Sequence, residues 1–172
     1  SLMDPAQRGR ILQKMAQATY ASAKELAALE SQNNGKTFRE ALGEIRYAAW
    51  TLEYFAGWSD KVEGNTIPTP GNRLNYTLRQ PLGVTAHIIP WNFPLQLAIR
   101  SIAPALAAGC TVIAKPASLT PVSLLQWCKV IEDCGLPNGV LQVITGPGGE
   151  IGDALAGSSG VDGIVLTGGV PT

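Results

Sequence analysis

The chain has 172 residues, 45% of them hydrophobic, and its 13 basic and 13 acidic side chains cancel. A chain of this length can bury a core of its own, and the balanced charge leaves no electrostatic surface for nucleic acid or an anionic membrane. No apolar run approaches the roughly 20 residues that span a bilayer, so we expect neither a membrane nor nucleic acid as a partner.

Two amphipathic helices are predicted within residues 1–62. The first begins at Asp4-Pro5, where a capping side chain precedes a proline, and runs to Asn33-Asn34-Gly35. The second begins at Thr37, with Glu40 three residues later as a capping box, and ends at Gly57. Steps of three and four predict its buried stripe: Phe38, Leu42, Ile45, Ala49, Leu52 and Phe55.

Residues 63–81 have a different pattern. Leu74, Tyr76 and Leu78 alternate with polar residues, which predicts a half-exposed antiparallel strand preceded by a turn over Thr66 to Gly71. After Pro81, apolar strands alternate with helices that start near Pro94, Pro121 and Gly149. This order is typical of an α/β fold, a doubly wound parallel sheet, with residues 63–81 as a short antiparallel excursion. The predicted strands are Val84–Ile89, Thr111–Ala114, Val140–Ile144 and Gly163–Leu166.

Two polar residues follow predicted strands. Asn92 lies in Pro90-Trp91-Asn92-Phe93-Pro94 after the first strand, and Lys115 opens Lys115-Pro116-Ala117-Ser118 after the second. Ligands bind at the carboxyl ends of the strands in an open parallel sheet, so we expect both side chains at one rim. From the residues alone, Asn92 can instead be a turn residue and Lys115 a solvated strand end.

The remaining reactive residues carry less information. Cys110, Cys128 and Cys134 have no paired spacing, and we interpret them as core residues of a protein in the reducing cytoplasm. His87 is the only histidine in the sequence, so a His-based triad and a multi-histidine metal site are both excluded from these residues. It lies inside an apolar strand, which favours a hydrogen-bonded core residue. No metal ligand set is predicted.

The two segments that carry Asn92 and Lys115 resemble motifs of the aldehyde dehydrogenase superfamily, and the resemblance runs through nearly all 172 residues. It implies a Rossmann-like dinucleotide-binding domain over residues 82–172, with residues 1–62 as its helical N-terminal part. It also implies that residues 63–81 serve subunit contact in a homo-oligomer. Because the sequence starts without Met and stops just after an apolar strand, we expect both ends to be cut and the catalytic domain to be absent.

The resemblance implies oxidation of an aldehyde to a carboxylic acid with NAD or NADP, through a cysteine thiohemiacetal and a thioester. Asn92 then donates a hydrogen bond to the aldehyde oxygen, where thiolate attack builds negative charge. The nucleophilic cysteine and the glutamate that activates water belong to segments after Thr172. We therefore expect the 172 residues alone to be inactive. The alternatives are a dinucleotide-binding module without catalysis and a conventional G-x-G-x-x-G dehydrogenase, whose fingerprint this sequence lacks.

The resemblance also assigns cofactor-binding residues. Pro90 and Trp91 lie beside the cofactor phosphates, and Lys115, Ala117 and Ser118 hold the adenosine ribose. Gly148 approaches the cofactor, although the glycines from Gly146 to Gly149 also suit a tight turn. Gly168 and Gly169 lie near the pyrophosphate, where the family has a Gly-Ser pair. Ser118 stands where the commoner family pattern has a glutamate, which would repel a 2′-phosphate, so we hypothesise that NADP is accepted as well as NAD.

Overall fold

The computed structural model describes residues 3–169. Its α/β fold combines a four-stranded parallel sheet with a small antiparallel pair, which confirms the predicted fold class. The elements in chain order are α1 (Pro5–Ala21), α2 (Ala23–Asn34), α3 (Phe38–Ala56), β1 (Thr66–Ile67), β2 (Asn75–Tyr76), β3 (Val84–Ile88), α4 (Pro94–Ala108), β4 (Thr111–Lys115), α5 (Val122–Val130), η1 (Glu132–Cys134), β5 (Leu141–Val143), α6 (Gly148–Ala156) and β6 (Gly163–Leu166).

The predicted helix starts are confirmed by their caps. The Asp4 carboxylate accepts hydrogen bonds from the amides of Ala6 and Gln7 at the start of α1. Thr37 and Glu40 form the reciprocal capping box of α3. These side chains satisfy amides that a helix leaves unpaired at its first turn.

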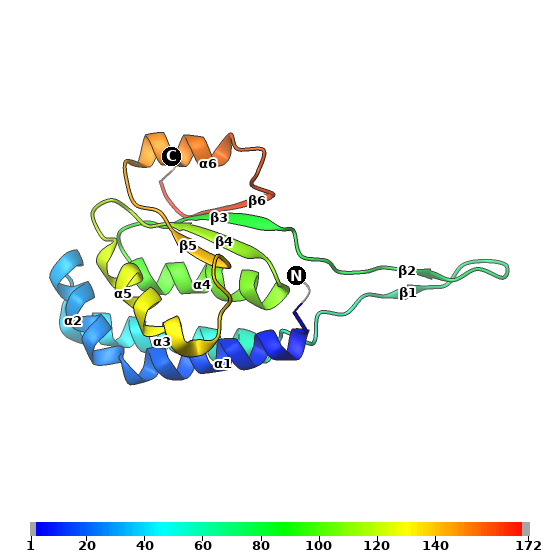
Figure 1. The fold of residues 1–172 in the computed structure, drawn as a ribbon, viewed down its shortest axis with the longest axis horizontal. Coiled ribbons are helices and arrows are strands. Elements are labelled where there is room, and N and C mark those ends of the chain that lie inside the picture. Colours follow the sequence, from blue (N-terminus) through cyan, green and yellow to red (C-terminus); the bar gives the residue numbers. More distant parts are fainter. Residues whose placement is uncertain (1–2, 170–172) are drawn as a thin grey trace.

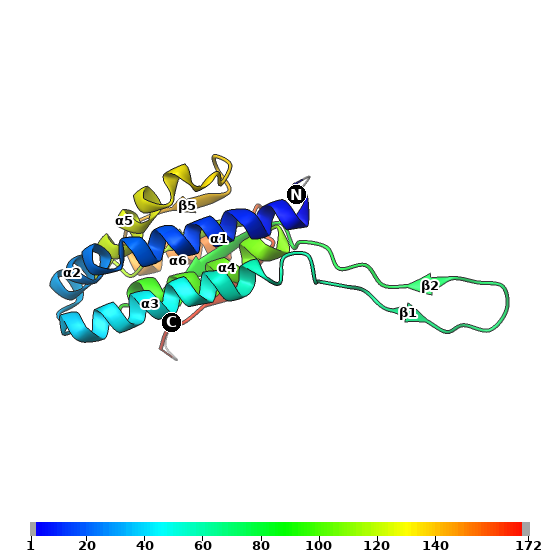
Figure 2. The same cartoon turned by 90° about the horizontal axis from the view of Figure 1, so that it is seen from below.

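The single long helix predicted up to Gly35 is wrong, because the chain breaks at Ser22 into α1 and α2. Ser22 leaves helical geometry with φ −91° and ψ 9°. The Ser22 side chain forms no cap hydrogen bond at the start of α2, so the lower helix propensity of serine, and not a cap, favours the break. The break turns α2 away from the α1 axis, as Figure 2 shows. It brings the end of α2 close to the loops that follow β3 and β4.

The predicted stripe of α3 is partly wrong. Ile45, Ala49 and Leu52 are fully buried, but Phe38 is 44% exposed and Leu42 and Phe55 are only partly buried. Ala41 and Ala48 are buried in their place. Small side chains let α3 pack closely on its neighbours α1, α2 and α4, and a search for large apolar residues overlooks them.

The parallel sheet has the strand order β5-β4-β3-β6. β4 and β6 both pair with β3, with Ile88 opposite Lys115 on one side and opposite Leu166 on the other. The chain adds β4 and then β5 on one side of β3, and it returns to add β6 on the other side. The neighbouring strands β3 and β6 therefore form a topological switch point, which opens a crevice at the carboxyl ends of the strands. Helices α1 to α5 cover one face of the sheet and α6 lies on the other (Figure 1).

The antiparallel pair projects from the domain as a long hairpin (Figures 1 and 2). Its register joins Thr66 to Tyr76 and Ile67 to Asn75, so Thr66 belongs to a strand and not to the predicted turn. The apolar side chains of Leu74 and Leu78 are 77% and 69% exposed. The prediction of a half-buried strand is therefore wrong for the described residues, because nothing in them covers this hairpin.

Candidate functional site

A cleft of about 510 Å³ lies at the carboxyl edge of the sheet, where the loops after β3, β4 and β6 meet the first residue of α6. Backbone bonds fix these strand ends against each other, since the Ile89 amide donates to the Lys115 carbonyl and the Thr167 amide to the Ile88 carbonyl. The cleft is lined by Ile88, Ile89, Pro90, Trp91, Asn92, Lys115, Ala117, Ser118, Leu119, Gly148, Leu166, Thr167, Gly168 and Gly169.

All nine residues that the sequence singles out lie on the wall of this one cleft. They come from segments that lie up to 79 residues apart in the sequence, from Pro90 to Gly169. The sequence did not single out the remaining lining residues, which are mostly apolar strand ends. Asn92 and Lys115 thus lie at one rim, as the parallel order of β3 and β4 requires.

Lys115 is the most unusual residue of the cleft. It is 3% exposed, and within residues 3–169 its ammonium forms no hydrogen bond or ion pair. Burial lowers the pKa of Lys115 from its ordinary value. The Lys115 ammonium lines the cleft and is not one of the fully buried unsatisfied atoms of the described residues, so this position suits an oxygen-rich ligand that supplies acceptors to a partly desolvated cation.

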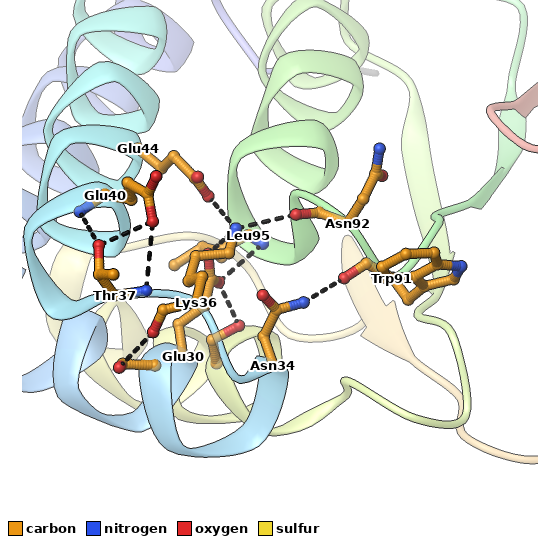
Figure 3. A network of polar contacts seen from close by, with 11 residues as sticks. Glu30, Asn34, Lys36, Thr37, Glu40, Glu44, Trp91, Asn92 and Leu95 are labelled. Atoms are coloured by element: carbon orange, nitrogen blue, oxygen red, sulfur yellow. Dashed lines mark hydrogen bonds and ion pairs between the residues drawn. The ribbon is translucent and has the colours of Figure 1, made fainter.

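Asn92 and Trp91 present their side chains at the mouth of the cleft. Trp91 is 59% exposed, and the Asn92 side-chain amide forms no hydrogen bond within the described part of the chain. Figure 3 shows the Asn92 side chain extending away from the contacts that hold its backbone carbonyl. The amide is therefore a neutral donor that is free for a ligand.

Ser118 is less free than its position in the sequence suggests. Its hydroxyl donates a 2.7 Å hydrogen bond to the carbonyl of Gly146, in the loop before α6. The hydroxyl oxygen can still accept a hydrogen bond, but its proton is committed. Gly148, the first residue of α6, lies close to Lys115: a Cβ added at Gly148 would be 3.9 Å from Lys115 Nζ.

Sequence reasoning missed a group of residues that hold the rim from outside (Figure 3). Lys36 Nζ donates to the Asn92 carbonyl at 2.8 Å, and the Asn34 amide donates to the Trp91 carbonyl at 2.6 Å. Lys36 also forms ion pairs with Glu30, at 3.6 Å, and with Glu44. The available signal was an acidic residue, Glu30, on the apolar side of a predicted helix.

Glu30 connects this group to two helices. Its Oε2 atom accepts from the Leu95 amide at 3.1 Å and from the Ser123 hydroxyl at 2.7 Å, so it joins α2 to the first turns of α4 and α5. Burial raises the pKa of the neighbouring Glu44, and the Lys36 ammonium opposes that rise. The cluster therefore depends on the Lys36 charge.

The other reactive side chains lie in or against the core: His87, Cys110 and Cys134 are buried, and Cys128, predicted as a core residue, is only partly buried. His87 is 1% exposed and its Nε2 atom lies 3.0 Å from the Thr85 hydroxyl, which confirms a hydrogen-bonded core residue. The three cysteines are free, and burial raises the pKa of Cys128 to about 11. A group of His, Cys, Asp or Glu side chains able to hold a metal ion is not found in residues 3–169. The described helices include none that is long and apolar enough to cross a membrane.

Comparison with known proteins decides the family. The sequence model of the aldehyde dehydrogenase family matches residues 1–172. The chain belongs to the aldehyde dehydrogenase family. It is 46% identical over 169 residues to a hydroxyisobutyraldehyde dehydrogenase of Mycolicibacterium austroafricanum and 42% identical over 167 residues to aldehyde dehydrogenase 1A1 of Equus caballus. These alignments cover 98% and 96% of this chain but 34% and 33% of the two relatives.

Solved structures agree with this assignment. The NAD+ complex of an aldehyde dehydrogenase from Bacillus cereus superposes with a TM-score of 0.94 at 41% identity, over 96% of this chain and 34% of that one. A betaine aldehyde dehydrogenase from Staphylococcus aureus, also in complex with NAD+, gives a TM-score of 0.96 at 34% identity, over 99% of this chain and 34% of that one. The chain thus spans about a third of the length of the aldehyde dehydrogenases that it matches.

Proposed function

We propose that this chain forms the cofactor-binding part of an NAD(P)-dependent aldehyde dehydrogenase, with its cleft as the dinucleotide site. The observation that carries the proposal is the convergence of all nine predicted residues on one cleft at the carboxyl edge of the sheet. Relatives of the same fold are complexes with NAD+. The unpaired Lys115 ammonium fits such a ligand, because ribose hydroxyls and phosphate oxygens are the acceptors it lacks.

Individual residues then have defined tasks. Lys115 and Ala117 hold the adenosine ribose, with the Ser118 oxygen as an acceptor for a ribose hydroxyl. Pro90, Trp91, Gly148, Gly168 and Gly169 form the wall beside the phosphates, where glycines expose backbone amides. When bound, the nicotinamide cofactor supplies the hydride acceptor. The substrate is an aldehyde, and the homo-oligomer and the cytoplasmic location stay predictions from the sequence.

Asn92 stabilises charge in the reaction. A cysteine thiolate, which we place in a segment outside these 172 residues, attacks the aldehyde carbonyl and turns its oxygen into an oxyanion. The Asn92 amide donates a hydrogen bond to that oxygen. As a fixed neutral donor, it need not be stripped of the hydration shell of an ion, and one such donor contributes roughly 3 kcal/mol.

The test is Asn92→Ala in the complete dehydrogenase that we propose. We expect kcat to fall by roughly 100- to 1,000-fold while the dissociation constant of NAD stays within about twofold. Asn138→Ala, in an exposed turn that does not line the cleft, is the matched control. An unchanged kcat for Asn92→Ala would remove its role. Aldehyde oxidation by the 172 residues alone would contradict the proposed division between cofactor binding and nucleophile.

Acceptance of NADP is a separate proposal, supported by Ser118. Serine removes the negative charge that a glutamate would place beside a 2′-phosphate. Its hydroxyl proton is held by Gly146, so the gain comes from lost repulsion and not from a new donor. We expect measurable turnover with NADP, and Ser118→Glu should reduce kcat/KM for NADP by at least about tenfold and leave that for NAD within about threefold. Strong rejection of NADP by the unmodified enzyme would end this proposal.

A further inference from the structure

The Asn92 loop, residues 89–93 between β3 and α4, is held by a buried and charged cluster of three side chains. The side chains of Glu30, Lys36 and Glu44 are 0%, 10% and 13% exposed. Two carboxylates share one ammonium, and charges withdrawn from water must keep their partners. Lys36 has little freedom to move between them, so the Asn92 carbonyl that accepts from Lys36 Nζ is held in one place. The Phe93 ring, whose centroid lies 4.9 Å from Nζ, covers the same ammonium.

The far end of the loop is held by Glu30. Phe93 occupies the N-cap position of α4 and offers no oxygen to the first-turn amides. Glu30 supplies that oxygen from α2, since its carboxylate accepts from the Leu95 amide. A carboxylate is also favourable at the positive end of a helix. The loop is thus fixed on both sides of Phe93-Pro94, at the Asn92 carbonyl and at the Leu95 amide.

We propose that Lys36 and Glu30 are positioning residues that set where the Asn92 amide stands in the cleft. This inference rests on the role proposed for Asn92 above. Neither side chain lines the cleft, and both act through the backbone of residues 92–95. An oxyanion donor works only near the reacting oxygen, and a displacement of about 1 Å can reduce a rate by about 100-fold. Loss of the Lys36 contact should therefore slow the chemical step and leave cofactor binding in place.

The first test compares Lys36 variants in the complete dehydrogenase. Lys36→Met alone would leave two buried carboxylates facing each other, so it is combined with Glu44→Gln, which is also measured alone. We expect the double variant to reduce kcat by roughly 10- to 100-fold with the NAD dissociation constant within about twofold. The single variant Lys36→Arg keeps the charge, so its kcat should be closer to that of the unmodified enzyme than the kcat of the double variant is. Lys24→Met, an exposed lysine of α2, is the matched control and should leave kcat unchanged.

The second test asks whether Lys36 acts through Asn92. If it does, the Lys36→Met/Glu44→Gln change should reduce kcat by less than about twofold in an Asn92→Ala background, since the donor that it positions is already missing. Two reductions that multiply would overturn the inference while leaving the role of Asn92 intact. The same holds for an unchanged kcat in the Lys36→Met/Glu44→Gln variant. No effect of Asn92→Ala itself would instead contradict the proposed function.

A third measurement does not depend on activity. Hydrogen exchange of the Leu95 amide, which donates to Glu30, should be faster by at least about tenfold in Glu30→Gln and in Lys36→Met/Glu44→Gln than in the unmodified protein, with the end of α4 unaffected. Equal exchange of the Leu95 amide in all three proteins would show that the cluster does not hold the start of α4. This outcome would overturn the inference even if the protein oxidised no aldehyde.

Discussion

The two edges of the parallel sheet both carry a cavity, and the larger one is not the candidate site. The cavity at the amino ends of the strands measures about 680 Å³, against about 510 Å³ for the cleft at the carboxyl ends. Its two charged lining residues are already paired: Arg8 donates to the carbonyls of Ala107 and Met3, and Asp162 accepts from the Val84 amide. At the carboxyl edge, the Lys115 ammonium and the Asn92 amide lack partners within residues 3–169. Free polar groups, not volume, distinguish a ligand site from a gap in packing.

The strongest test of this contrast is Lys115→Met, which keeps the length of the side chain and removes its charge. If Lys115 donates to the ribose as proposed, this change should weaken NAD binding by about 100-fold, because a hydrogen bond to a charged group contributes up to about 3 kcal/mol. The measurement is a titration of NAD followed by tryptophan fluorescence, since Trp91 lines the cleft.

The amino edge supplies the control for this experiment. Arg8→Met removes two hydrogen bonds to backbone carbonyls and should lower the free energy of unfolding by roughly 1 to 3 kcal/mol, with the NAD dissociation constant unchanged. If Arg8→Met weakened NAD binding as much as Lys115→Met does, the contrast between the two edges would collapse.

The smallest expected effect is on the free energy of unfolding, and it concerns both edges because His87 lies in β3, which runs between them. Burial lowers the pKa of His87, in β3, to about 4. The unfolded chain takes up a proton near pH 6.5 and the folded chain only near pH 4, so this contribution to stability is complete above the higher value and is lost as the pH falls towards the lower one. We expect His87 to account for a loss of about 2 kcal/mol between roughly pH 7 and pH 5.

Urea unfolding of the unmodified chain and of His87→Gln over this pH range measures that contribution. The variant should lose less stability than the unmodified chain as the pH falls, whatever its stability at neutral pH. Parallel pH profiles for the two proteins would show that His87 is not the titrating group.

Much of this architecture could be predicted because its signals are local. The capping side chains, the prolines at helix starts and the apolar strand runs each lie within a few residues of the element they define. The cleft residues followed from two short motifs and from the rule that parallel strands end at one edge. Asp4, Thr37 and Pro94 therefore marked helix starts correctly.

Apart from the local break at Ser22, the errors and omissions in the helices and the rim arise from contacts between distant segments. The buried face of α3 depends on alanines that matter only because α1, α2 and α4 approach them closely. The role of Glu30 depends on Leu95 and Ser123, which are 65 and 93 residues away. The acidic Glu30 on an apolar helix side was a local signal, but no local pattern identifies its partners, so how it supports the rim was visible only in the folded chain.

The position of Glu30 in the chain also bears on how the protein is made. Ribosomes release the N-terminal part of a protein first, so the acceptor carboxylate emerges well before Leu95 and Ser123, its two donors. Helix α4 can receive its missing cap as soon as its first turn leaves the exit tunnel, and α5 can dock on the same oxygen afterwards. During synthesis, the α1 to α3 unit can thus act as a template on which the carboxyl edge of the sheet is assembled in chain order.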